Sequence, residues 1–145
     1  RLDVQFNQAN MLYIDDYAHH PAEISYTISS IREFYPKKRI TGIFQPHLYS
    51  RTRDFAREFA ESLELLDELI LLDIYPAREK PIEGVSSRII LDQVQHIPAQ
   101  IASKKELLGL LDNRNIETLV ALGAGDIDQM VEPIRQMMEK RVAAQ

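Results

Sequence analysis

The sequence contains no cysteine among its 145 residues, which excludes a disulfide scaffold, a thiolate metal site and a cysteine nucleophile. It also lacks any uninterrupted apolar run close to the roughly 18 residues that a membrane-spanning helix needs, so we expect no membrane partner. The first residues do not form a signal peptide, and a start at Arg1 rather than Met predicts a piece of a longer protein. A glycine-rich phosphate loop of the G-x-x-x-x-G-K-S/T type is absent, so any ATP chemistry must take that loop from elsewhere.

The charge of the chain is acidic overall but unevenly distributed. Seventeen Lys and Arg residues against 22 Asp and Glu residues give a net charge of −5, which argues against a general nucleic-acid partner. Residues 32–57 nevertheless carry seven basic and two acidic side chains, a net charge of +5. Such a basic region on an acidic protein indicates a confined anionic ligand, although a solvated face with ordinary ion pairs gives the same pattern.

The hydrophobic pattern predicts one domain, residues 1–145, built around a buried sheet. The length, the 45% hydrophobic content and the 27% charged content are ordinary for a single globular unit. Four short apolar runs are continuous rather than alternating, as in strands that are buried on both faces. They are residues 11–14, 40–44, 69–72 and 119–122. Weaker strands are expected at residues 98–102 and, as an edge strand, at residues 4–6.

Amphipathic segments between these runs predict helices. Pro21 is placed as the first residue of one helix, and Pro36 ends it. The apolar side chains at helical spacing, aromatic and Met residues included, are expected to face the core. They are Ile24, Ile28, Ile31 and Tyr35, then Phe55, Phe59, Leu63 and Leu66, and last Ile127, Met130, Val131, Ile134 and Met138. Short helices are expected from Ser86 or Ser87 to residue 95 and from Ser103 to residue 111, with a loop at residues 75–85.

This order of elements predicts an α/β fold, a three-layer, mostly parallel, Rossmann-like sheet with helices on both faces. The segment 4–6 allows one antiparallel edge strand. In such sheets ligands bind beyond the carboxyl ends of the strands. Polar segments follow all four apolar runs, beginning at Asp15, Gln45, Asp73 and Gly123, so their side chains should converge on one edge.

The segment after the first run offers carboxylates and imidazoles. Asp15 and Asp16 can bind a ribose hydroxyl or a hydrated Mg²⁺, or one of them can cap the turn. His19 and His20 precede a helix, where adjacent side chains are expected to point apart, so we predict no shared zinc and no metal ligand in this chain. A neutral imidazole near a phosphate or an incoming amine fits this position better.

The segment after the second run is the richest in positive charge. Arg51 and Arg53 stand at the start of a predicted helix. There, free N–H groups, the helix dipole and two guanidinium groups favour an anion site for phosphate or carboxylate. The alternative is that the arginines pair with acidic side chains along the helix, namely Asp54, Glu58 or Glu61.

Four motifs resemble the C-terminal domain of the Mur ligase family, in the order of the family and over almost the whole chain. They are residues 15–21 (Asp-Asp-Tyr-Ala-His-His-Pro), 44–53 (Phe-Gln-Pro-His-Leu-Tyr-Ser-Arg-Thr-Arg), 74–79 (Ile-Tyr-Pro-Ala-Arg-Glu) and 123–127 (Gly-Ala-Gly-Asp-Ile). The second and third motifs are specific to the branch that adds L-alanine. The first is shared with the branch that reattaches recycled murein tripeptide, which remains an alternative.

The resemblance implies one domain of a larger three-domain, ATP-dependent ligase of peptidoglycan synthesis in the bacterial cytoplasm. ATP would phosphorylate the lactyl carboxylate of UDP-N-acetylmuramate, and the amine of L-alanine would attack the acyl phosphate. The family's N-terminal domain binds the UDP sugar, and its central domain carries the phosphate loop and most Mg²⁺ ligands. The present domain would close over the central domain to orient the reactants and exclude water, and alone it is expected to be inactive.

Carried over by position, the resemblance places Asp16 at the ATP ribose, Tyr17 at the adenine and His19 near the phosphates. His19 and His47 would be the catalytic histidines, with His47 as a candidate base for the alanine ammonium group. Gly125 would either lie beside the ligand or serve only packing.

The L-alanine site implied by the resemblance consists of His47, Arg51 and Arg53. Arg51 would bind the carboxylate, and Arg53 would either support it or be purely structural. Many family members have Arg directly after the histidine of the second motif, where this chain has Leu48. Arg51 is therefore expected to carry more of the carboxylate binding here.

One alternative comes from a different class of protein, the phospho-acceptor receiver domain. Receivers have a similar α/β fold, an acidic pair after the first strand and a phosphorylated Asp after the third, which Asp15, Asp16 and Asp73 would match. They also need a Lys after the last strand, where Gly123 stands, and this alternative leaves residues 45–53 unexplained.

Overall fold

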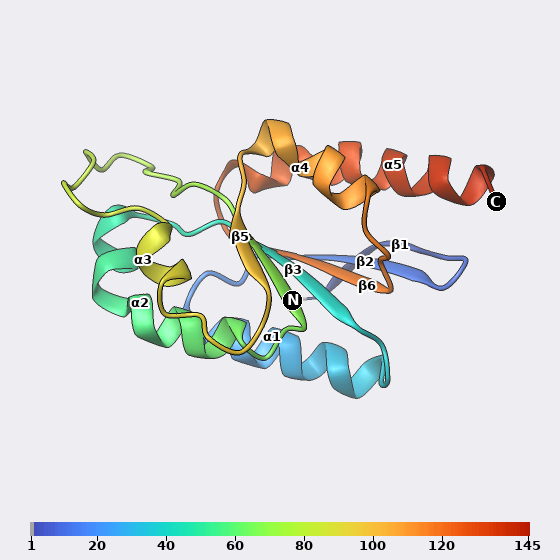
Figure 1. The fold of residues 1–145 in the computed structure, drawn as a ribbon, viewed down its shortest axis with the longest axis horizontal. Helices are drawn as coiled ribbons and strands as arrows, with labels where there is room; N and C mark the ends of the chain where they lie inside the picture. Colours follow the sequence, from blue (N-terminus) through green and yellow to red (C-terminus); the bar gives the residue numbers. More distant parts are fainter. Residues whose placement is uncertain (1) are drawn as a thin grey trace.

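A central sheet of six strands lies between two layers of helices in the computed structural model, which describes residues 2–145 (Figure 1). The strands are β1 (Asp3–Gln8), β2 (Met11–Asp16), β3 (Ile40–Phe44), β4 (Glu68–Leu71), β5 (Ala99–Ile101) and β6 (Thr118–Leu122). The helices are α1 (Pro21–Phe34), α2 (Tyr49–Leu63), α3 (Arg88–Leu91), α4 (Lys104–Asp112) and α5 (Val131–Ala143), the last preceded by a 3₁₀ turn (Asp126–Met130). Helices α1, α2 and α3 cover one face of the sheet, and α4 and α5 cover the other.

The sheet has the order β1-β2-β6-β3-β4-β5, and all its pairs are parallel except the antiparallel hairpin of β1 and β2. This confirms the predicted three-layer α/β fold with its antiparallel edge strand. The carboxyl ends of the strands are in register, because Asp16 lies opposite Leu122, Leu122 opposite Phe44, and Phe44 opposite Leu71. The polar segments that follow these strands therefore meet at one edge of the sheet.

The strand order excludes the receiver alternative. A receiver-type sheet has the order 2-1-3-4-5, in which the first and third strands are neighbours. Numbered along the chain in the same way, the parallel strands of this protein have the order 1-5-2-3-4, because β6 is inserted between β2 and β3. Asp73 follows β4, which β3 and β6 separate from the acidic pair at the end of β2.

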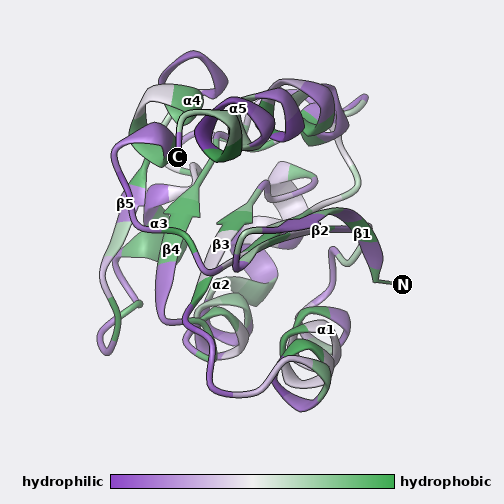
Figure 2. Ribbon diagram, turned by 90° about the vertical axis from the view of Figure 1, so that its right-hand side faces the viewer, coloured by the Kyte–Doolittle hydropathy of each residue, from purple (hydrophilic) through white to green (hydrophobic). Residues whose placement is uncertain are grey.

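Two apolar cores hold the layers together, and alternate side chains of each strand supply them. On β2, Leu12 and Ile14 belong to the core beneath α1 and α2, whereas Met11 and Tyr13 belong to the core beneath α4 and α5. Figure 2 shows the hydrophobic strands enclosed between helices whose outer sides are mostly hydrophilic. The continuous apolar runs therefore form strands buried on both faces, as predicted.

The prediction for the second helix is wrong at Phe55, which is 43% exposed instead of facing the core. Its backbone is non-helical, with φ −121° and ψ 20°, so α2 is kinked there and the helical spacing is interrupted. Phe59 and Leu63 are buried as expected. Leu66 is also buried, but it lies beyond the end of α2, in the turn before β4.

The middle of the chain is less regular than predicted. Helix α3 ends at Leu91 rather than near residue 95. The N–H groups of residues 95 and 96 donate instead to the Glu64 carboxylate, at 2.7 and 2.8 Å. Strand β5 and helix α4 form where expected, and the Ser103 side chain caps α4.

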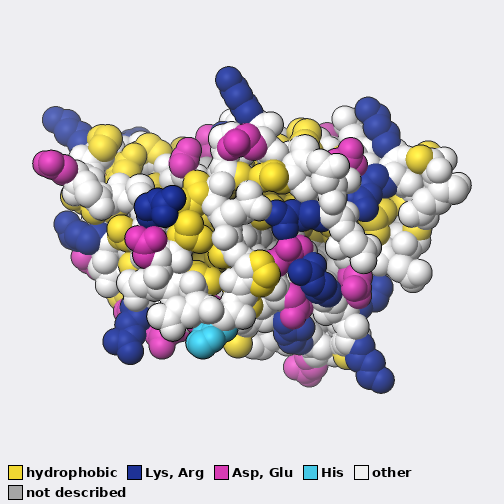
Figure 3. Space-filling view, in the orientation of Figure 1, with side chains coloured by type: hydrophobic (Ala, Val, Ile, Leu, Met, Phe, Trp, Pro, Cys, Tyr) yellow, Lys and Arg dark blue, Asp and Glu magenta, His cyan; other side chains and the backbone are white. Residues whose placement is uncertain are grey.

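The outer surface carries both signs of charge. Figure 3 shows acidic and basic side chains interspersed over the face seen in Figure 1. Within residues 2–145, the helices are all too short or too polar to span a lipid bilayer.

An ion-pair network around the buried carboxylate of Glu68 closes the amino end of the sheet. The Glu68 carboxylate, 8% exposed, accepts hydrogen bonds from Arg39 at 2.9 Å, from Arg114 at 2.6 Å and from the Thr41 hydroxyl at 2.7 Å. Burial alone would raise the pKa of Glu68, but these hydrogen bonds and the two positive charges bring it below its ordinary value. The network joins β3, β4 and the segment before β6.

We expect Glu68→Ala to lower the free energy of unfolding by about 2–3 kcal/mol, because it leaves two arginines without their partner. Urea unfolding measures this, with Glu58→Ala, an exposed residue of α2, as the control. The contribution of Glu68 is complete above its ordinary pKa of 4.5 and is lost as the pH falls through the lowered pKa of the folded state. A loss below about 0.5 kcal/mol would show that the network contributes little net stability.

Candidate functional site

The loop after β2 is held by Asp16, which is only 3% exposed. Its Oδ1 accepts the N–H of Ala18 and its Oδ2 accepts the hydroxyl of Thr27 on α1, both at 3.0 Å. Asp16 is thus the member of the acidic pair that holds the turn, and Tyr17 remains 68% exposed beside it. Burial and the neighbouring carboxylates raise the pKa of Asp15 to about 6.

A cavity of about 390 Å³ adjoins this loop and the first turns of α1. It is lined by Asp16, Tyr17, Ala18, His19, Ala22, Glu23, Tyr26 and Thr27. The structure therefore brings together Asp16, Tyr17 and His19, the three residues predicted to bind ATP. Sequence reasoning missed Tyr26, which is 76% exposed. Its spacing of four residues from Ala22 was the available signal, because side chains four apart share one face of a helix.

The prediction that the adjacent histidines point apart is wrong. The ring centroids of His19 and His20 are 4.7 Å apart, and the His47 ring lies 5.9 Å from His19. The loops after β2 and β3 thus bring three imidazoles together, which the sequence did not reveal. Within residues 2–145, His19, His20 and Glu23 also offer ligand atoms within 4.8 Å of one another, which could hold a metal ion.

The start of α1 is closed by its own side chain. The Oε1 of Glu23 accepts the N–H of His19 at 3.1 Å and the N–H of His20 at 3.0 Å. These backbone hydrogen bonds, the one from His19 above all, lower the pKa of Glu23 despite the opposing effect of burial. The N–H groups of His19 and His20 are therefore already used and are not available to a phosphate in this cavity.

His47 lies between two backbone hydrogen bonds that tie its segment to the loop after β4. The N–H of Tyr75 donates to Pro46 O at 2.8 Å, and the N–H of Leu48 donates to Tyr75 O at 2.9 Å. Burial first, then the positive charge of Arg51 and the neighbouring His19, lower the pKa of His47 below its ordinary 6.5. The imidazole is therefore neutral at neutral pH, and within residues 2–145 its buried Nδ1 has no hydrogen-bond partner.

The two arginines at the start of α2 have different surroundings. Arg53 is half exposed and forms an ion pair with Asp54 at 2.8 Å. For this arginine, the structure thus shows the pairing with an acidic side chain of the helix that the sequence left open as an alternative. The buried Nη1 of Arg51 has no hydrogen-bond partner within residues 2–145. Arg51 thus keeps a donor for an anionic ligand, whereas the charge of Arg53 is already paired with Asp54.

The predicted anion site at the start of α2 is wrong in one respect, because the N–H groups of its first two residues are not free. The carboxylate of Glu79, from the loop after β4, accepts the N–H of Tyr49 at 2.6 Å, the N–H of Ser50 at 3.1 Å and the Ser50 hydroxyl. Hydrogen bonds to Ser50 and Tyr49 lower the pKa of Glu79. The Arg51 side chain, whose Nη1 has no partner within residues 2–145, is therefore the better candidate for binding a substrate anion at this edge.

Gly125 serves packing, the second of the two roles considered for it. A Cβ atom there would lie 2.5 Å from the Tyr75 ring and 2.6 Å from Oε1 of Gln45. Gln45 in turn accepts the N–H of Ile127 at 2.9 Å and donates to Asp126 at 2.6 Å. The glycine lets the loop after β6 approach the two residues that support the segment around His47.

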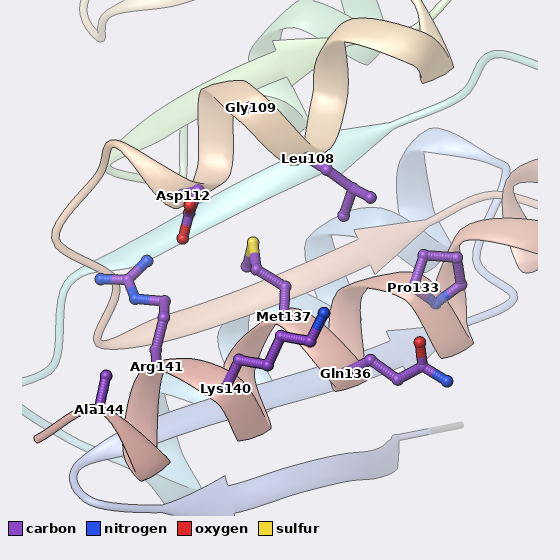
Figure 4. A pocket seen from close by; sticks show the side chains of 9 residues that line it. All are labelled: Leu108, Gly109, Asp112, Pro133, Gln136, Met137, Lys140, Arg141 and Ala144. Atoms are coloured by element: carbon purple, nitrogen blue, oxygen red, sulfur yellow. The ribbon is translucent and has the colours of Figure 1, made fainter.

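A separate cavity of about 550 Å³ lies between α4 and α5, away from the candidate site (Figure 4). Leu108 and Met137 supply its apolar lining, while Lys140 and Asp112 lie at its polar side. It contains no residue predicted from the sequence to bind a substrate.

Comparisons with known proteins agree with the geometry. The sequence profile described as "Mur ligase, glutamate ligase domain" matches residues 1–140. The UDP-N-acetylmuramate–L-alanine ligase of Parabacteroides distasonis is 53% identical over 142 residues, which cover 98% of this chain and 31% of that protein. The ligase of the same name from Phocaeicola vulgatus is 49% identical, over 97% of this chain and 31% of that protein.

A solved structure has the same fold as this chain. The crystal structure of a UDP-N-acetylmuramate–alanine ligase from Thermotoga maritima matches with a TM-score of 0.74 and 25% identity, over 99% of this chain and 30% of that one. The chain thus spans about a third of the length of the relatives it matches. The fold, the four motifs and these matches agree, and the chain belongs to the C-terminal domain family of the Mur ligases.

Proposed function

We propose that this chain is the C-terminal domain of a three-domain bacterial ligase that joins L-alanine to UDP-N-acetylmuramate in the cytoplasm, at the expense of ATP. The observation that supports this best is the unused, buried Nη1 of Arg51 beside a neutral His47. That pair suits an amino acid, because one group can bind the carboxylate and the other can accept a proton from the amine. Relatives 49% and 53% identical carry the name of this ligase.

The nucleotide would bind in the cavity beside α1. Its exposed Tyr17 and Tyr26 rings suit an adenine face, and a hydroxyl of the ribose can donate to Asp16, since each carboxylate oxygen accepts more than one hydrogen bond. His19 lines the same cavity and its ring lies 5.9 Å from that of His47, so the phosphates would lie beside it. ATP supplies the phosphoryl group that activates the lactyl carboxylate, and Mg²⁺ would be held mainly outside this chain.

In the amide-forming step, the nitrogen of L-alanine attacks the carbonyl carbon of the acyl phosphate. The C–N bond forms, an N–H proton leaves, and the C–O bond to phosphate breaks, so that inorganic phosphate is released. Arg51 would hold the alanine carboxylate and His47 would take the proton from the nitrogen. Closure of this domain over the others would exclude water, which otherwise hydrolyses the acyl phosphate.

Phosphate release by the full-length protein tests the proposal. The assay contains ATP, Mg²⁺ and UDP-N-acetylmuramate, with L-alanine in one reaction and murein tripeptide in another. Release with L-alanine alone is expected, whereas release only with tripeptide would assign the protein to the recycling branch. Residues 1–145 alone are the control and should release nothing, because they contain no phosphate-binding loop of the P-loop type. Release by this control would contradict the three-domain proposal.

A further inference from the structure

Helix α2 starts differently from the other helices that a carboxylate closes. In α1 and α4 the third helical residue is a glutamate, Glu23 or Glu106, and it closes its own helix as part of a capping box. In α2 the corresponding third residue is Arg51, after the N-cap residue Leu48. A positive charge there is unfavourable, because the N-terminus of a helix already carries partial positive charge. Helix α2 therefore has no glutamate of its own to cap it, because Arg51 occupies the third position.

The missing carboxylate comes from Glu79, about 30 residues along the chain. Glu79 accepts the N–H groups of Tyr49 and Ser50, the first two residues of α2, and the Ser50 hydroxyl, so it caps the start of this helix from outside. Its own loop is held by the hydrogen bond from the N–H of Glu79 to Pro76 O, at 2.9 Å. Leu48 adopts φ 72°, a conformation that is costly for a residue with a side chain, so the start of α2 needs such outside support.

We propose that Glu79 is a positioning residue for amino-acid binding, which holds His47 and Arg51 in the orientation that receives the incoming substrate. The inference rests on the proposed function. Tyr49 and Ser50, which Glu79 holds, lie between His47 and Arg51 in sequence, and the backbone pairing of His47 with Tyr75 joins the same two segments. Glu79 also fills the helix N-terminus with negative charge, which leaves the Arg51 guanidinium as the place for the substrate carboxylate.

The test compares Glu79→Ala and Glu79→Gln with wild type in the full-length protein, by phosphate release. Glu83→Ala, an exposed glutamate of the same loop, is the matched control. We expect Glu79→Ala to raise the KM for L-alanine about tenfold, comparable to the loss of one charge-assisted hydrogen bond. The KM values for ATP and UDP-N-acetylmuramate should change less than about twofold. Glu79→Gln keeps an oxygen that accepts the N–H groups and should have a smaller effect, and it remains informative if the alanine variant does not fold.

Two further measurements separate positioning from a merely structural role. Added acetate can occupy the vacated helix N-terminus in Glu79→Ala, so it should restore part of the KM for L-alanine. Hydrogen exchange of the amides of Tyr49 and Ser50 should become faster in this variant and slower again with acetate. An unchanged KM for L-alanine despite faster exchange would overturn the proposal. So would an equal rise of all three KM values that acetate does not reverse.

The activity of wild type distinguishes this inference from the function on which it rests. If wild type uses murein tripeptide instead of L-alanine, the same comparison of KM values is made with tripeptide, and a selective rise still supports Glu79. If wild type uses neither, the proposed function fails. Glu79 is then judged by hydrogen exchange, and unchanged exchange in Glu79→Ala would overturn its role at the start of α2.

Discussion

Arg51→Ala is expected to raise the KM for L-alanine by roughly 10- to 100-fold in the full-length protein, the range for hydrogen bonds to a charged group. The guanidinium of Arg51 is partly buried and one of its nitrogens has no partner within residues 2–145. A substrate carboxylate can accept hydrogen bonds from this guanidinium. The N–H groups of Tyr49 and Ser50 cannot take its place, because they already donate to Glu79.

Substrate selectivity is the informative readout for Arg51. The KM for ATP should change little, since the ATP cavity is formed by the loop after β2 and by α1. Arg57→Ala removes an exposed arginine two turns along the same helix and serves as the control for the loss of positive charge. Arg51→Lys should fall between wild type and Arg51→Ala, because lysine keeps the charge but loses the two-pronged geometry. Unchanged kinetics with L-alanine would remove Arg51 from the site.

His47→Gln is expected to lower kcat/KM for L-alanine about 100-fold near neutral pH, the lower end of what a positioned base contributes. Glutamine keeps a polar side chain at the site but cannot take the proton from the amine. The groups that face His47 are Arg51, His19, His20 and Glu79, and their combined effect with burial is a pKa below 6.5. The imidazole is then a competent base throughout the neutral range.

The pH dependence of the rate with L-alanine tests whether His47 acts in its neutral form. Because the lowered pKa keeps His47 neutral above that value, the contribution of His47 to the wild-type rate should be lost as the pH drops through it, below 6.5. His47→Gln should lose this acidic limb, whereas the alanine ammonium group titrates in the same way in both proteins. His96→Gln, an exposed histidine remote in sequence from the site, is the control. An acidic limb that persists in His47→Gln would exclude His47 as the base.

Much of the architecture could be predicted from local sequence pattern. Continuous apolar runs became the buried strands, and prolines at positions 21 and 36 bounded α1. These features depend on neighbours a few residues away, and their physical causes are short-ranged. The same holds for the identity of the site residues, because the loops that end parallel strands meet at one edge whatever the order of the strands. The grouping of Asp16, Tyr17 and His19 as a nucleotide site came from the resemblance to the Mur ligase family, and the three residues line one cavity.

The tertiary structure decided whatever depends on residues far apart in the chain. The insertion of β6 between β2 and β3 separates this fold from the receiver alternative, and no periodicity encodes it. The approach of His19 to His47 joins two loops, and the kink at Phe55 broke an otherwise regular helical spacing. The helix N-terminus at Arg51 looked free in the sequence because its carboxylate, Glu79, lies about 30 residues away. Hydrogen bonds of this kind form only when packing brings distant segments together. The sequence therefore determines which chemical groups are present near the site, and the fold determines which of them remain available to a substrate.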